Sequence, residues 1–67
     1  MIEDRILQDM RELREVAEKT GTHYGFWSLM MDAEACIQGK RTILPPELIE
    51  KKLQETIAEL RRKKPSH

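Results

Sequence analysis

The sequence predicts an all-α domain of three helices, at about residues 2–20, 24–38 and 45–63. Apolar residues recur at steps of three and four in the first and last of these segments, as they do along one face of an α-helix. Gly21 and Gly39 follow the first and second segments, where a glycine commonly ends a helix. No stretch alternates between apolar and polar residues over the length of a strand. Three helices with short connections therefore account for the chain.

The first segment, residues 2–20, has the pattern of an amphipathic helix. Its apolar stripe consists of Ile2, Ile6, Met10, Leu13 and Ala17, widened by Leu7 and Val16. Glu15 and Lys19 are four residues apart, in the order that favours an ion pair along a helix. Gly21 can adopt the left-handed conformation that suits a helix C-terminus. The segment is expected to pack one face against the rest of the chain.

The second segment starts between Thr22 and Ser28, either of which could cap it, and stops at Gln38. Its broad apolar face comprises Phe26, Leu29, Met30, Ala33, Cys36 and Ile37. A second apolar face comprises Trp27, Met31 and Ala35, with Glu34 and Gln38 interleaved. A helix with so little polar surface is usually covered on more than one side. This helix is therefore expected to be the shared core element.

The third segment opens at Pro45-Pro46, because proline is well tolerated in the first turn of a helix. Its inward stripe is Ile49, Leu53, Ile57 and Leu60, joined by Leu48. Acidic residues come early in this segment and basic residues late, which matches the helix dipole at both ends. Pro65 is expected to stop the helix.

A chain of 67 residues makes one domain, here residues 1–67, and a domain of this size buries only about 60% of its unfolded surface. Small folds therefore usually need a further source of stability. One cysteine cannot form an internal disulfide, and one cysteine with two histidines is a poor zinc set. Oligomerisation is the remaining common solution, so we expect a homodimer or a higher oligomer.

The second apolar face of the middle helix is the predicted interface. It comprises Trp27, Met31, Glu34, Ala35 and Gln38. Tryptophan is favoured at the centre of interfaces, and methionine adapts to irregular partners. The leading hypothesis is a non-enzymatic interaction or regulatory protein that presents this face to a second copy or to another protein. The alternative is that the first and third helices cover both faces of the middle helix within one chain.

Charge gives no general attraction to nucleic acid or to anionic membrane, since 12 basic residues balance 12 acidic ones. No apolar run approaches the roughly 20 residues of a membrane-spanning helix. The N-terminus is acidic and amphipathic, unlike a secretory signal. A cytoplasmic protein with a reduced thiol is the resulting expectation.

Two further functions stay open as alternatives. In the first, Lys40 and Arg41 contact an anion, and two copies combine them with the basic run of residues 61–64 into a surface for nucleic acid. In the second, a small anionic ligand such as a nucleotide is held between subunits near Tyr24, Trp27 and Arg41. The spacing of a phosphate-binding P-loop is absent from the sequence.

No catalytic, cofactor or metal site is predicted, and the chain is not expected to be an enzyme. His23 has no second histidine near it in sequence, because His67 lies at the other end of the chain. Cys36 falls on the broad apolar face, where a thiol behaves as a small hydrophobic group. Asp32 and Glu34 are two residues apart and so point to different sides of a helix.

Overall fold

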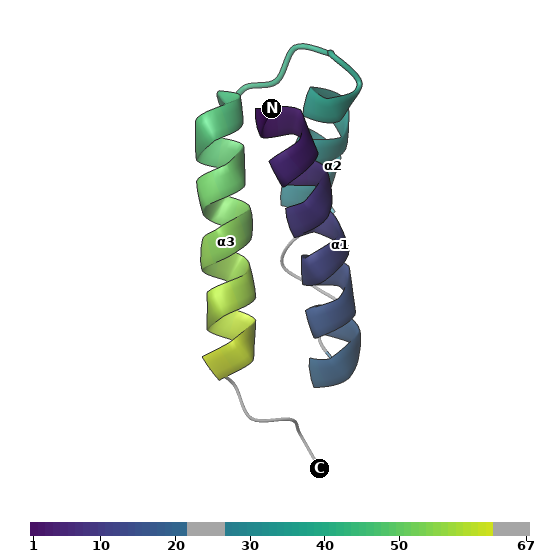
Figure 1. Ribbon diagram of the computed structural model, residues 1–67, viewed down its shortest axis with the longest axis vertical. Coiled ribbons are helices and arrows are strands. Elements are labelled where there is room, and N and C mark those ends of the chain that lie inside the picture. Colours follow the sequence, from purple (N-terminus) through teal and green to yellow (C-terminus); the bar gives the residue numbers. More distant parts are fainter. Residues whose placement is uncertain (22–26, 63–67) are drawn as a thin grey trace.

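The structure is a computed structural model that describes residues 1–21 and 27–62. These residues form three α-helices: α1 is Ile2–Thr20, α2 is Trp27–Ile37 and α3 is Pro46–Arg62 (Figure 1). The described ranges contain no strand. The all-α prediction of three helices is confirmed.

The predicted helix limits agree with the structure to within one residue wherever they can be compared. The first helix matches its prediction of 2–20, α2 ends at Ile37 rather than at 38, and α3 begins at Pro46 rather than at 45. Ser28 lies inside α2, so it does not cap that helix. Residues 24–26 and 63 of the predicted helices lie outside the described residues.

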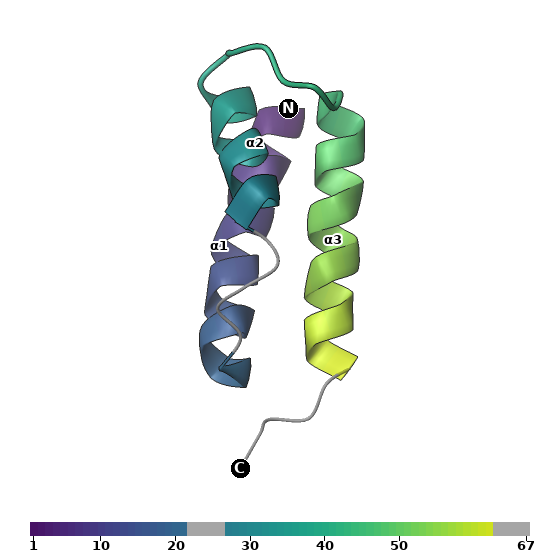
Figure 2. The same cartoon turned by 180° about the vertical axis from the view of Figure 1, so that it is seen from behind.

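α1 and α3 run in the same direction, and α2 runs opposite to both (Figures 1 and 2). Side-chain pairs tie α1 to α3 at matching levels. The Arg5 guanidinium donates to Glu50 at 2.7 Å, and the Gln54 amide donates to Asp9 at 3.4 Å. α2 has 11 residues against 19 in α1, which corresponds to about 16 Å against about 28 Å. It therefore lies beside the half of the α1–α3 pair where both of those helices begin, as Figure 2 shows.

The core is built from the inward stripes of the three helices. Its buried members are Ile6, Met10, Leu13, Val16, Ala17, Met30, Ala33, Cys36, Ile49, Leu53, Ile57 and Leu60. Five of these side chains are 0% exposed: Ile6, Leu13, Ile49 and Leu53, which come from α1 and α3, and the smaller Ala33, which comes from α2. The two long helices thus supply the large side chains at the centre of the core, and α2 closes it on one side.

The structure corrects the predicted apolar stripes at two residues, Leu7 and Leu48. Both were expected to face inward, but they are 38% and 42% exposed. Each follows or precedes a fully buried isoleucine, Ile6 or Ile49, and consecutive residues of a helix point about 100° apart. Leu7 and Leu48 therefore lie at the edges of their stripes.

Glycines end α1 and α2 as the sequence predicts. Gly21 has φ 71° and donates its N–H to the carbonyls of Ala17 and Glu18. Gly39 has φ 77° and donates to the Cys36 carbonyl at 3.1 Å, while the next N–H, that of Lys40, reaches the Ala35 carbonyl at 2.9 Å. These bonds use carbonyls that the helix itself leaves without partners. The chain can therefore turn sharply after each helix.

Candidate interaction surface

One side of α2 points away from both other helices. We call the five residues of the predicted interface the outer α2 face: Trp27, Met31, Glu34 and Ala35 of α2, and Gln38, which follows the last residue of that helix. Four of them are exposed, and Ala35 is half-buried. Trp27 is 65% exposed and Met31 is 68% exposed, whereas Met30 and Ala33 of the same helix are buried. The structure thus places two large apolar side chains one helical turn apart on the surface.

The apolar side chains of the outer α2 face become smaller from the N-terminal to the C-terminal end of the helix. Trp27 is the first residue of α2, Met31 follows one turn later, and the half-buried Ala35 follows after another turn. Glu34 and Gln38 are exposed beside Ala35, and the Gln38 amide donates to the Glu34 carboxylate at 3.5 Å. The face is therefore bulky and apolar at one end, and small with a polar border at the other.

The alternative that α1 and α3 cover both faces of α2 within one chain is wrong for the described residues. In a three-helix bundle each helix meets its two neighbours on its inward side only. The inward side of α2 is formed by Met30, Ala33 and Cys36, with Leu29 and Ile37 half-buried at its borders. Nothing in the geometry of the bundle brings α1 or α3 to the opposite side.

The two borders of the outer α2 face belong to different neighbours. Ser28 and Asp32 line a shallow depression together with Lys52 and Glu55 of α3, so this border faces α3. Glu34 lies on the other border and therefore on the α1 side.

α1 also has two distinguishable edges. Arg5, Asp9 and Glu12 pair with α3 and mark one edge of the α1 core stripe. The helical period then places the second edge, toward α2, at Glu3, Leu7 and Arg14, and we call these three residues the α2-facing edge of α1.

Cys36 lies in the last turn of α2, at the end of the bundle where α1 begins (Figure 2). Burial raises the pKa of its thiol, and the carboxylates of Glu3 and Glu47 raise that pKa further. Glu3 and Glu47 belong to the first turns of α1 and α3. Cys36 itself belongs to the buried core. It is 9% exposed, and a thiol that stays protonated is a weak nucleophile. The core position predicted for Cys36 is confirmed.

The described members of the two predicted basic groups lie apart within one chain. Lys40 and Arg41 are exposed in the connector that leads into α3, whereas Arg61 and Arg62 lie at the other end of that helix (Figure 1). Arg61 pairs with Glu12 at 2.7 Å. Lys63 and Lys64 lie outside the described residues. A joined basic surface is therefore not present among the described residues of one chain.

Of the predicted small-ligand site between subunits, the structure describes Trp27 and Arg41, and these two lie apart within one chain. Trp27 begins α2, and Arg41 follows its C-terminal end, so the two lie at opposite ends of that helix. Tyr24 and His23 lie outside the described residues, as does His67.

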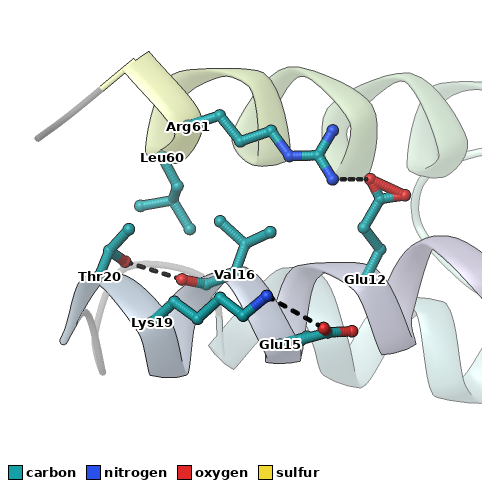
Figure 3. A pocket seen from close by; sticks show the side chains of 7 residues that line it. All are labelled: Glu12, Glu15, Val16, Lys19, Thr20, Leu60 and Arg61. Carbon is teal, nitrogen blue, oxygen red and sulfur yellow. Dashed lines mark hydrogen bonds and ion pairs between the residues drawn. The ribbon is translucent and has the colours of Figure 1, made fainter. Parts of the chain in front are cut away.

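A hollow lies between α1 and α3, past the N-terminal end of α2 (Figure 3). Val16 and Leu60 face each other across it. Its charged rim residues pair with one another: Arg61 with Glu12 at 2.7 Å, and Lys19 with Glu15 at 3.3 Å. The Glu15–Lys19 pair confirms the prediction from the sequence. The hollow measures about 290 Å³, at the lower limit of small-molecule sites, and its paired charges leave little to orient a ligand.

Sequence reasoning did not anticipate the exposure of Ile43, which is 96% exposed in the connector. Its position two residues before a Pro-Pro pair is the signal that could have identified it, since such a residue joins neither neighbouring helix.

Within residues 1–21 and 27–62, no group of three His, Cys, Asp or Glu side chains could hold a metal ion. None of the described helices has the length and hydropathy needed to cross a membrane. No protein-family model, curated protein sequence or solved structure matches this chain. The outer α2 face is therefore the feature from which a function has to be argued.

Proposed function

We propose that this protein is a small non-enzymatic interaction protein that self-associates through the outer α2 face. The observation that carries the proposal is the exposure of Trp27 and Met31, each about two-thirds open to solvent and one turn apart on one helix. Exposed apolar side chains scattered singly are common on protein surfaces, but a contiguous apolar stripe marks a binding surface.

Burial of Trp27 in an interface would contribute strongly. A tryptophan buries about 150–250 Å² in a protein interior. The 65% that is exposed here corresponds to about 100–160 Å², or roughly 2.5–4 kcal/mol at about 25 cal/mol per Å². An exposed ion pair contributes only about 0–1 kcal/mol. The apolar stripe, and not the charges around it, would therefore dominate the affinity.

Self-association would also increase the stability of a chain this short. A protein of 67 residues has a free energy of unfolding of about 3–10 kcal/mol, at the usual value of about 0.05–0.15 kcal/mol per residue. A second copy that binds only the folded chain adds to that margin. The dimer would then be the working unit, with its remaining surfaces open to regulatory partners.

The test is a double variant, Trp27→Ala with Met31→Glu. We expect it to lower the mass measured by sedimentation equilibrium while circular dichroism retains most of the helical signal, because both positions point out of the bundle. Ile43→Glu is the matched control, since it also changes an exposed apolar residue, and it should keep the wild-type mass. An unchanged sedimentation profile for the double variant would reject this interface.

Fluorescence gives a second readout. Trp27 is the single tryptophan of the sequence, so its emission reports on the outer α2 face alone. Dilution of the wild type should shift the emission to longer wavelength as copies separate and the indole meets water. Emission that is independent of concentration, together with a constant mass, would contradict the proposal.

A further inference from the structure

We propose that two copies pair through antiparallel α2 helices around a two-fold axis at Met31, so that Trp27 of each protomer packs against the partner's Ala35. This inference rests on the self-association proposed above and adds the orientation and register of the partner. In this register, a residue of one α2 lies level with the residue of the partner's α2 for which the two numbers sum to 62, as 27 and 35 do.

The taper of the outer α2 face selects this orientation. The distance between two packed helices depends on the side chains at the contact. A parallel pair would set Trp27 against its own copy at one end and Ala35 against its own copy at the other, so the helices would splay and leave a gap. The antiparallel pair sets one large side chain against one small one at both ends, with Met31 against its own copy in the middle. Only this arrangement keeps the two helices at a constant distance.

The charges beside the face select the same orientation. The C-terminal end of α2, with Cys36 in its last turn, lies at the level of the first turn of α1, to which Glu3 belongs (Figure 2). Arg14 follows Glu3 by eleven residues, or about 16 Å along α1, and Cys36 is about 7.5 Å beyond Met31 along α2. Because the two helices are antiparallel, Arg14 lies about 9 Å from the level of Met31, on the Trp27 side.

The two-fold axis carries the partner's Arg14 the same distance in the opposite direction. That level falls between Glu34, about 4.5 Å from Met31, and Gln38, about 10.5 Å from it. The axis also places the α2-facing edges of both α1 helices on the same side of the contact, which is the side of Glu34. Each Glu34 carboxylate then lies next to the partner's Arg14, and symmetry repeats the pair.

A parallel pair lacks this match. It would leave both copies of Arg14 on the Trp27 side of Met31, away from both copies of Glu34. Size and charge thus give independent reasons for the antiparallel register.

Cysteine cross-linking separates orientation from association. In a Cys36→Ala background, Met31→Cys should form a covalent dimer under mild oxidation, since Met31 faces its own copy in either orientation. Trp27→Cys and Ala35→Cys should each cross-link poorly alone, because copies of one position lie about 12 Å apart along α2, beyond disulfide reach. An equal mixture of those two variants should cross-link readily, because these positions face each other within disulfide reach.

The outcomes are distinguishable. Absence of a covalent dimer from Met31→Cys, with a monomeric mass at every concentration, would overturn both the proposed function and this inference. A covalent dimer from Met31→Cys together with efficient self-linking of Ala35→Cys would overturn the antiparallel register and leave self-association standing.

A charge exchange tests the register without cysteines. Glu34→Arg and Arg14→Glu should each raise the dissociation constant of the dimer by about fivefold or more, since each creates two like-charged contacts. The combined variant should return to within about twofold of wild type. Both residues are exposed, and circular dichroism checks that each variant folds. Additive losses in the combined variant would contradict the pairing of Glu34 with the partner's Arg14.

Discussion

Leu53 and Leu48 are the same residue type on the same helix, and the structure gives them different surroundings. Leu53 is 0% exposed at the centre of the core, and Leu48 is 42% exposed at the edge of the α3 stripe. Replacement of either by alanine slightly favours the helix, because alanine has the higher helix propensity. Any loss of stability therefore measures burial and not helix formation.

The expected costs differ several-fold. Leu→Ala at a fully buried position lowers the free energy of unfolding by about 2–5 kcal/mol, since it removes apolar contacts and leaves a cavity. The total for a chain of this length is only about 3–10 kcal/mol, so Leu53→Ala should remove a large share of it. At Leu48 solvent fills the vacated space, and the cost should stay at about 1 kcal/mol or less.

Urea unfolding followed by circular dichroism measures both costs. All variants must be compared at one protein concentration, because self-association makes apparent stability depend on concentration. With a urea slope of about 1 kcal/mol per M for so small a protein, Leu53→Ala should move the midpoint down by about 2 M or more, and Leu48→Ala by about 1 M or less. Equal shifts for the two variants would refute the assignment of Leu53 to the core centre.

Three further predictions concern single groups. Gly21→Ala should lower the free energy of unfolding by about 1–2 kcal/mol in the same urea assay, because a residue with a Cβ is strained at a φ of +71°. The added Cβ would meet no atom within 4 Å, so the loss would come from backbone strain and not from a clash. No loss would refute the left-handed C-cap. Desolvation by burial raises the pKa of Asp9 above its ordinary 3.8, so the native state holds the proton more tightly, and stability should fall as pH rises from about 3.8 through the raised value. A pH series of urea unfolding should show that fall reduced in Asp9→Asn, and an identical series for the two proteins would contradict it. A thiol reagent should label Cys36 at least about tenfold more slowly in the native protein than in urea, and equal rates would contradict its burial.

The sequence predicts α1 and α3 well because both carry regular apolar stripes with clear end signals. Gly21 ends α1 and Pro46 begins α3 through their own backbone conformations, so both helix ends can be predicted from the local sequence. Periodicity is less able to define the edge of a stripe. Leu7 and Leu48 show this, because whether such a residue is covered depends on where the neighbouring helix lies.

The level at which α3 packs along α1 could not be read from the sequence. It is visible in pairs such as Arg5 with Glu50, which are 45 residues apart and look like ordinary surface charges in the sequence. The outer α2 face was predictable for a different reason. Its membership follows from the period of one helix, and its exposure follows from the limit that two neighbouring helices can cover only the inward side of a third.

The central claim is that a second copy covers the outer α2 face in solution, and sedimentation equilibrium of the wild-type protein tests it most directly. A concentration series should reveal a species of twice the 7.9 kDa of one chain, which dissociates on dilution while Trp27 emission shifts to longer wavelength. A constant mass of 7.9 kDa up to the highest soluble concentration would contradict the account.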